Sequence, residues 1–201
     1  MSANIITPPT GSKTRKLQIN RLPELPPITA ANRARRAVWR LVWALLFRPT
    51  PIFAHRWRIA LVRLFGARIN SRAYIYPTVR IWEPRNLTMG EGSCLAGEVD
   101  CYNVAPVRLE DFALVSQKTF LCTASHDYRL DEFPLTGGPI TLGKQSWVAA
   151  EAFVAPGVNI GDRAVVLARS VVVHSVPRSE VFGGNPARRV ALRDTHNYDF
   201  D

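Results

Sequence analysis

One histidine stands where its side chain could do chemistry. Residues 121 to 130 read LCTASHDYRL, with His126 at the centre. An ordinary imidazole has a pKa near 6.5, so a positioned histidine can take a proton from a hydroxyl group near neutral pH. The segment also fits a solvated loop histidine, which is the commoner fate of a lone His. His55, His174 and His196 lie in a basic segment, near a turn and in the tail, and none has an equivalent setting.

A six-residue repeat runs through the chain on both sides of His126. Four residues after each aliphatic position stands a small or β-branched residue, with Arg85 as the exception. On a strand, that small residue and the next aliphatic one point to the same face. The aliphatic positions are Ile69, Ile75, Ile81, Met89, Leu95, Cys101, Leu109, Val115, Leu121, Leu142, Val148, Val154, Ile160, Val166 and Val172.

Three units of this repeat build one coil of a stack. The coils begin at residues 69, 89, 109, 142 and 160, and the intervening residues suit tight corners. The repeat therefore predicts an all-β fold, a parallel β-helix of hexapeptide repeats. An insertion over residues 124–139 separates the third coil from the fourth and holds His126.

The side chains between the inward pairs should face outward. Phe120, Phe153 and Trp147 fall there, and covering each of them would gain roughly 1.5–3 kcal/mol. We therefore expect prisms to associate side by side, as a homotrimer with active sites between the protomers. Cys101 occupies an inward position and is expected in the core. The three cysteines lack CxxC spacing, so a reducing cytoplasm fits best and no metal site is predicted.

The positive charge belongs to the N-terminal third. Residues 1–68 hold 13 Lys or Arg against one acid, Glu24, whereas residues 69–201 hold 13 bases against 15 acids. Two amphipathic helices are expected there, over 33–47 and 52–65, where they could cap the open end of the β-helix or lie on an anionic membrane. Both can hold at once. The acidic body argues against nucleic-acid binding.

The expected organisation has four parts. They are an extended arm (1–32), a basic helical segment (33–68), a β-helix domain (69–182) and a closing motif with a tail (183–201). The longest apolar stretch, residues 37–47, contains Arg40 and is about half of the ~20 residues needed to span a bilayer. No signal peptide is expected, and a cytoplasmic protein peripheral to the inner face of the membrane fits.

Three further segments carry a family resemblance. TASHDY (123–128), SWVAAEAFVAPGVNIGDRAVV (146–166) and VFGGNPARRV (181–190) accompany the repeats. Over residues 33–192 the chain resembles the left-handed β-helix acetyltransferases, most of all the colanic acid biosynthesis branch, relatives of the galactoside and maltose acetyltransferases. The resemblance implies acetyl transfer from acetyl-CoA to a sugar hydroxyl of a polysaccharide or its precursor. His126 would be the general base, with no metal and no acyl-enzyme.

The resemblance also implies residues for coenzyme A. Trp147 would wall the thioester groove or fill an interface, and Ala150 and Ala168 match positions along which pantetheine runs. The oxyanion donor would be a backbone N–H near Ala149 and Ala150. Arg169, where the family carries glycine, and Val173-His174, where it carries Thr-Lys, are departures. Arg169 could contact a coenzyme phosphate or be solvated. The closing motif preserves Gly184, Asn185, Pro186 and Arg188, and Arg188 could pair with phosphate or be solvated.

The acceptor side is expected one coil before His126. Asp100 and Asn103 could hydrogen-bond to sugar hydroxyls, as polar residues of this region do in the family, or could be solvated. Two rival functions remain. A γ-type carbonic anhydrase needs three zinc histidines, of which only His126 is placed to contribute. A non-catalytic β-helix scaffold or membrane-docked interaction protein would bind no coenzyme A.

Overall fold

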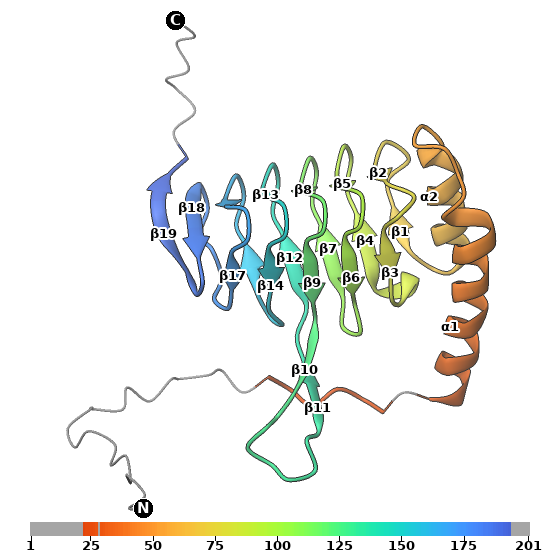
Figure 1. Cartoon of the computed structure of the whole chain (residues 1–201), viewed down its shortest axis with the longest axis horizontal. Coiled ribbons are helices and arrows are strands. Elements are labelled where there is room, and N and C mark those ends of the chain that lie inside the picture. The colour runs from red at the N-terminus through yellow and green to blue at the C-terminus, as the bar shows by residue number, and fades with distance from the viewer. Residues whose placement is uncertain (1–21, 28, 194–201) are drawn as a thin grey trace, which may run out of the picture.

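The computed structural model describes residues 22–27 and 29–193. Short strands stack into a parallel β-helix with three long sheets, and helices lie across its N-terminal end (Figure 1). The first sheet contains β1 (Arg68–Ile69), β4 (Leu87–Met89), β7 (Val107–Leu109), β12 (Ile140–Leu142) and β15 (Asn159–Ile160).

The other two sheets complete the triangular coils. The second sheet contains β2 (Tyr74–Ile75), β5 (Cys94–Leu95), β8 (Leu114–Val115), β13 (Trp147–Val148), β16 (Val165–Val166), β18 (Glu180–Gly184) and β19 (Ala187–Leu192). The third contains β3 (Arg80–Ile81), β6 (Asp100–Tyr102), β9 (Phe120–Cys122), β14 (Phe153–Val154) and β17 (Val171–Val172). These strands are parallel, except that β19 runs antiparallel to β18. The hexapeptide register is confirmed.

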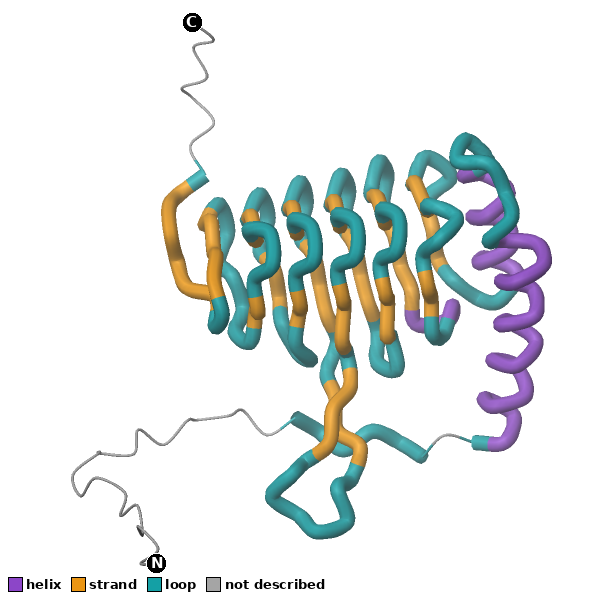
Figure 2. The backbone as a smooth tube through the Cα atoms, viewed as in Figure 1, coloured by secondary structure: helices purple, strands orange, loops and turns teal. Residues whose placement is uncertain are grey.

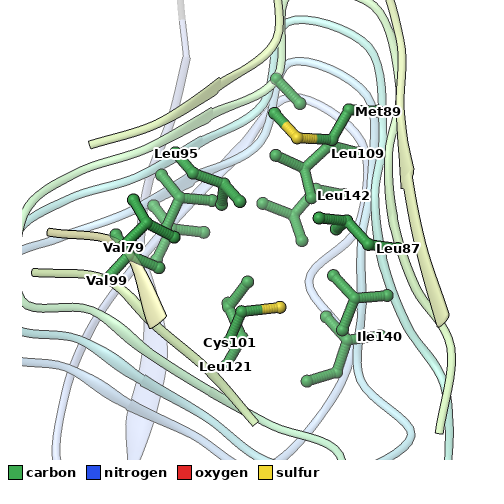
Figure 3. Packing of buried hydrophobic residues seen from close by; sticks show 14 of the residues in the cluster. Val79, Leu87, Met89, Leu95, Val99, Cys101, Leu109, Leu121, Ile140 and Leu142 are labelled. Atoms are coloured by element: carbon green, nitrogen blue, oxygen red, sulfur yellow. The ribbon is translucent and has the colours of Figure 1, made fainter. Parts of the chain in front are cut away.

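The core is the stack of inward aliphatic side chains. Met89, Leu109 and Leu142 follow one another in register along the first sheet, and Cys101 precedes Leu121 in the third (Figure 3). All five are at most 2% exposed. Each coil thus buries the same face as its neighbours, which is why a fixed six-residue spacing specifies the fold.

The insertion leaves this stack without disturbing it. Strand β7 pairs directly with β12, so the third coil contacts the fourth although the insertion separates them in sequence. The inserted residues form a hairpin of β10 (Ala124–His126) and β11 (Leu135–Gly137), which stands away from the coils (Figure 2). The six-residue pattern places Ser125, four residues after Leu121, on the inward face of a coil, and this expectation is wrong. Ser125 is exposed because the chain has already left the coil at Ala124.

The N-terminal helices cap the open end of the β-helix. They are α1 (Ala30–Val42), the π-helical segment η1 (Trp43–Phe47) and α2 (His55–Leu64). The indole groups of Trp39 and Trp43 donate to the Ile81 and Val79 carbonyls at 2.7 and 2.8 Å. Buried Arg58 donates to the Ile75 carbonyl at 2.6 Å. These bonds satisfy edge groups of the first coil, which confirms the capping role.

A short 3-10 helix, η2 (Pro84–Asn86), breaks the first coil at the place where Arg85 interrupts the repeat. Helix α1 begins three residues earlier than expected, after its N-cap Thr29, whose side chain accepts from the Asn32 N–H at 3.2 Å. In the part of the chain described, no helix is both long and apolar enough to cross a bilayer.

Candidate active site

His126 lies on the hairpin, at the last residue of β10. Its exposed side chain is positioned by antiparallel pairing of β10 with β11, in which His126 is opposite Leu135. A cavity of about 140 Å³ opens beside it, lined in part by Leu22, Ser125 and Tyr128. A small molecule can therefore reach the imidazole from solvent.

One hydrogen bond fixes the orientation of the ring. The Nδ1 atom of His126 lies 2.5 Å from the Phe133 carbonyl oxygen. A carbonyl only accepts, so Nδ1 must carry the proton of the neutral ring. The lone pair then resides on Nε2, which becomes the atom able to take a proton. The neighbouring Asp127 is paired with Arg129 at 2.5 Å.

Residues 22–27, called the arm here, add a third strand to the hairpin. The Leu25 N–H donates to the Leu135 carbonyl at 2.9 Å, and the Gly137 N–H donates to the Pro23 carbonyl at 3.1 Å. A side chain at Gly137 would come within 2.6 Å of Leu25 and 2.4 Å of the Thr123 carbonyl. The glycine is thus required for the arm to approach. The rest of the expected arm (1–32) lies largely outside the described residues.

The coenzyme candidates gather along the second sheet and the corner that follows it. Trp147 projects outward from β13, is 41% exposed and donates from its indole to Ser116 Oγ at 2.9 Å. Ala150 and Ala168 occupy the same corner in successive coils, since the Arg169 N–H donates to the Ala150 carbonyl at 2.9 Å. The small side chains leave this corner open.

The surroundings of the expected oxyanion donor and of Arg169 limit what each can bind. The Ala149 N–H is held by the Val166 carbonyl at 2.9 Å, so it cannot also stabilise an oxyanion. The Ala150 N–H forms no hydrogen bond within the described residues and remains the candidate donor. Arg169 pairs with Glu151 at 2.7 Å, and this bond raises the pKa of Arg169 and lowers that of Glu151.

The closing motif forms the turn between β18 and β19. The Gly184 N–H donates to Ser170 Oγ at 3.2 Å, which ties this turn to the corner of Ala168. Gly184 has a φ of +98°, which favours glycine. Asn185 precedes a cis-proline and is exposed. Among residues 22–27 and 29–193, the only hydrogen-bond acceptor of the exposed Arg188 side chain is its own neighbour, the Ala187 carbonyl, at 2.9 Å.

The two acceptor candidates differ in their surroundings. Asp100 faces outward from β6, and burial raises the pKa of its carboxyl although Arg80 opposes this effect. Asn103 is completely buried, accepts from the Glu83 N–H at 2.9 Å and donates to the Glu83 carbonyl at 2.7 Å. The expectation that Asn103 contacts the sugar is therefore wrong. Its amide already serves the backbone of the preceding coil and does not reach solvent.

The base and the coenzyme candidates are not brought together within one chain. His126 follows the carboxyl end of strand β9, whereas Ala150 and Ala168 precede the amino ends of β14 and β17 in the same sheet. They therefore lie at opposite edges of the third sheet.

The outward aromatic residues are less exposed than expected. Phe120 and Phe153 are half-buried because they pack edge-to-face, with 5.5 Å between the ring centroids. Tyr102 extends this row at 6.3 Å from Phe120. The exposure of Phe120 and Phe153 is lower than expected because neighbouring coils shield one another's aromatic side chains.

The remaining reactive side chains have structural surroundings. Burial raises the pKa of Cys94 to about 11 and also raises that of Cys101 and Cys122, so none of these thiols is activated. His55 Nδ1 bonds to the Ile75 carbonyl at 2.9 Å. His174 is exposed, and His196 lies outside the described residues. No cluster of three metal-ligating side chains occurs in the described segments.

Three contributors to the site were missed by the sequence reasoning. Phe133 acts through its carbonyl, for which no residue type is a signal. Leu22 and Leu25 contact a hairpin about 110 residues later in the chain, and only the pair Gly137-Gly138 in the hairpin hinted at a close backbone approach.

Known proteins share both the sequence and the fold. No family model matches the chain. A protein of Escherichia coli K12 that bears the name colanic acid biosynthesis acetyltransferase WcaF is 40% identical over 163 residues, 81% of this chain and 88% of that protein. The galactoside O-acetyltransferase of the same organism is 25% identical, over 70% of this chain and 72% of its own length.

A solved structure gives the fold comparison. The hexapeptide-repeat acetyltransferase VCA0836 of Vibrio cholerae, in complex with acetyl coenzyme A, superposes with a TM-score of 0.71 and 29% identity, over 83% of this chain and 91% of the other. The fold shared with such neighbours is the left-handed parallel β-helix, which confirms the expected fold class.

Proposed function

The chain belongs to the family of hexapeptide-repeat acetyltransferases, and we propose that it moves an acetyl group from acetyl-CoA to a sugar hydroxyl of a polysaccharide or its precursor. The single observation that carries the proposal is the geometry of His126. Its Nδ1 is held by the Phe133 carbonyl, which leaves Nε2 as the basic atom, and its side chain lines a cavity that a small molecule can enter.

The reaction needs one base and one oxyanion donor. Nε2 of His126 takes the proton of the acceptor hydroxyl while its oxygen attacks the thioester carbonyl carbon. The Ala150 N–H stabilises the resulting oxyanion. The intermediate then collapses, the carbon–sulfur bond breaks, and the imidazolium returns the proton to the leaving thiolate. No acyl-enzyme is needed, in agreement with the buried thiols.

Coenzyme A is assigned to the corner of Ala150 and Ala168. Trp147 forms a wall of the groove, and the small alanine side chains allow pantetheine to lie along the coils. Gly184, Asn185 and Arg188 border the far end, where Arg188 has free guanidinium donors for a phosphate. Arg169 can join them only by exchanging its bond to exposed Glu151. Asp100 is retained as a sugar contact on the acceptor side.

A homotrimer completes the site. Because His126 and Ala150 lie at opposite edges of one sheet, side-by-side packing of three prisms would bring the base of one protomer to the coenzyme groove of the next. Sedimentation equilibrium should give three times the chain mass. A fully active monomer would contradict the shared site.

The helical cap provides a second surface, which we propose docks on an anionic membrane. Leu45, Phe53 and Leu64 are 62%, 84% and 80% exposed, in a segment that carries Arg33, Arg56 and Arg63. Apolar side chains flanked by arginine suit the lipid interface. Sedimentation with vesicles tests this. Binding should require phosphatidylglycerol and should weaken in Phe53→Ser, and equal binding to neutral vesicles would contradict it.

The function itself is tested by transfer of a labelled acetyl group. Nucleotide sugars, lipid-linked sugars and oligosaccharides are incubated with acetyl-CoA and the full chain. Acetylation of one class at a hydroxyl is expected. If the chain binds no coenzyme A at millimolar concentration, the result would instead favour a non-catalytic scaffold. One bound zinc ion per protomer would favour a γ-type carbonic anhydrase.

A further inference from the structure

A second cavity lies between the α1–η1 segment and the outer face of the third sheet. Its volume is about 380 Å³, and it does not include His126. Half-buried aromatic rings form much of its wall. The Trp82 and Tyr102 rings lie 5.0 Å apart, and Phe120 and Trp43 line the same space. These rings offer an apolar surface to a ligand.

Three arginines stand at the rim of this cavity. They are Arg40, Arg48 and Arg80, all exposed and facing a single acid, Asp100. Arg40 lies 5.4 Å from the centroid of Trp82, and Arg48 lies 5.5 Å from that of Trp43. Within the described residues none of the three guanidinium groups makes a hydrogen bond or a salt bridge. The aromatic rings thus position Arg40 and Arg48, and the donors of all three guanidinium groups remain available.

A further arginine, Arg36, also contacts the Trp82 ring. The Arg36 guanidinium lies 4.5 Å from the ring, and its buried Nε and Nη1 have no hydrogen-bond partner in the described part of the chain. In contrast, Arg35 is neutralised by Glu83 at 2.6 Å. An excess of unpaired cations around one indole favours an anion in this region.

We propose that this cavity binds a phosphate ester whose body is flat or apolar. The phosphate lies between Arg40 and Arg48, which can donate charge-assisted hydrogen bonds, and the body lies against Trp82 and Tyr102. A bare anion would leave the aromatic wall uncovered, and a neutral apolar molecule would leave the guanidinium groups without a partner.

One wall of the cavity belongs to the strand that leads to the candidate base. Phe120, which lines it, begins strand β9, and the chain proceeds from β9 through Thr123 into β10 and His126. Resting on the proposed acetyl transfer, the ligand is the phosphate-bearing carrier end of the sugar acceptor. A nucleotide and a prenyl phosphate both have this chemistry.

Binding to the full chain without acetyl-CoA tests the site. The probes are uridine monophosphate, farnesyl phosphate, farnesol and inorganic phosphate, and titration calorimetry measures the dissociation constant of each. One of the two phosphate esters should bind at least tenfold more tightly than farnesol and inorganic phosphate. Which ester binds identifies the source of the carrier.

Matched variants locate the bound phosphate. Arg40→Ala/Arg48→Ala should weaken ester binding at least tenfold, whereas Arg108→Ala/Arg178→Ala removes the same charge from exposed positions outside the cavity and should leave it unchanged. Equal weakening in both double variants, or equal binding of all four probes, would overturn the inference. The binding experiment contains no acetyl donor, so its result does not depend on acetyl transfer. Failure of the proposed cavity and failure of the proposed acetyl transfer are therefore distinguished.

Discussion

The Nδ1 atom of His126 and the carbonyl oxygen of Phe133 face each other across the hairpin at 2.5 Å. The two residues come from opposite sides of the same loop, so one bond fixes both the ring orientation and the tautomer. A loop histidine without a role would gain little from such a bond in water. The relationship therefore supports a base whose Nε2 is kept ready for an incoming hydroxyl.

The arm should contribute to turnover by holding this hairpin. Leu25→Pro removes the N–H that donates to the Leu135 carbonyl, and Pro is compatible with the extended backbone of the arm. Losing one hydrogen bond of about 1 kcal/mol should lower kcat by roughly five- to tenfold. The KM for acetyl-CoA should change little, because the lost bond holds the hairpin, whereas the groove of Ala150 and Ala168 is built by the coils of the β-helix.

Leu25→Ala is the matched control for the arm. It keeps the N–H and should retain most of the kcat. Steady-state kinetics of both variants decide the matter. If Leu25→Pro had the wild-type kcat, or if both variants lost turnover equally, the backbone pairing of the arm would not position His126.

The repeat made the β-helix predictable, whereas the site was only partly so. The strands of the coils contain the aliphatic positions of the six-residue spacing, because one buried face fixes the register of every coil. The corners were less predictable. Lys118, Glu151 and Arg169 adopt φ of 59° to 60°, where glycine or asparagine is the usual signal. Coil stacking holds these ordinary residues in the left-handed region.

The polar residues of the site show why sequence reasoning stops short. Asp100 and Asn103 are three residues apart and look alike as sugar contacts, yet only Asn103 turns inward to bond with Glu83. The orientation depends on a backbone group one coil earlier, which the local sequence does not encode. His126 was found because its motif interrupts the repeat.

A bulky side chain at the open corner should block the coenzyme. Ala168→Tyr fills the space beside Ala150 and should raise the KM for acetyl-CoA by about tenfold, equivalent to about 1.4 kcal/mol of lost binding. Arg108→Tyr is the control, since Arg108 is exposed on the first sheet. Kinetics with varied acetyl-CoA measure the effect, and an unchanged KM in Ala168→Tyr would remove this corner from the coenzyme site.

Stability should depend on the protonation of His55. Burial lowers the pKa of His55, and Arg58 lowers it further, although the bond to Ile75 opposes them. The folded chain therefore binds fewer protons than the unfolded chain just below the ordinary pKa of about 6.5. Its contribution to stability is present above that pH and is lost as the pH falls.

Thermal melting between pH 7.5 and 5.5 measures this contribution. The melting temperature of the wild type should fall over that interval. His55→Asn retains an amide donor for the Ile75 carbonyl but does not titrate, so its melting temperature should fall less. Equal slopes for the two chains would show that His55 does not control this pH dependence.

The most direct measurement is the acetylation rate of His126→Ala on the identified acceptor. Removing the base should lower kcat by about 10²- to 10⁴-fold, while the affinity for acetyl-CoA stays within a few-fold. The melting temperature should hardly change because the side chain is exposed. His174→Ala, also at an exposed histidine, should retain full activity. A folded His126→Ala chain with the wild-type kcat would contradict the role of His126 as the general base.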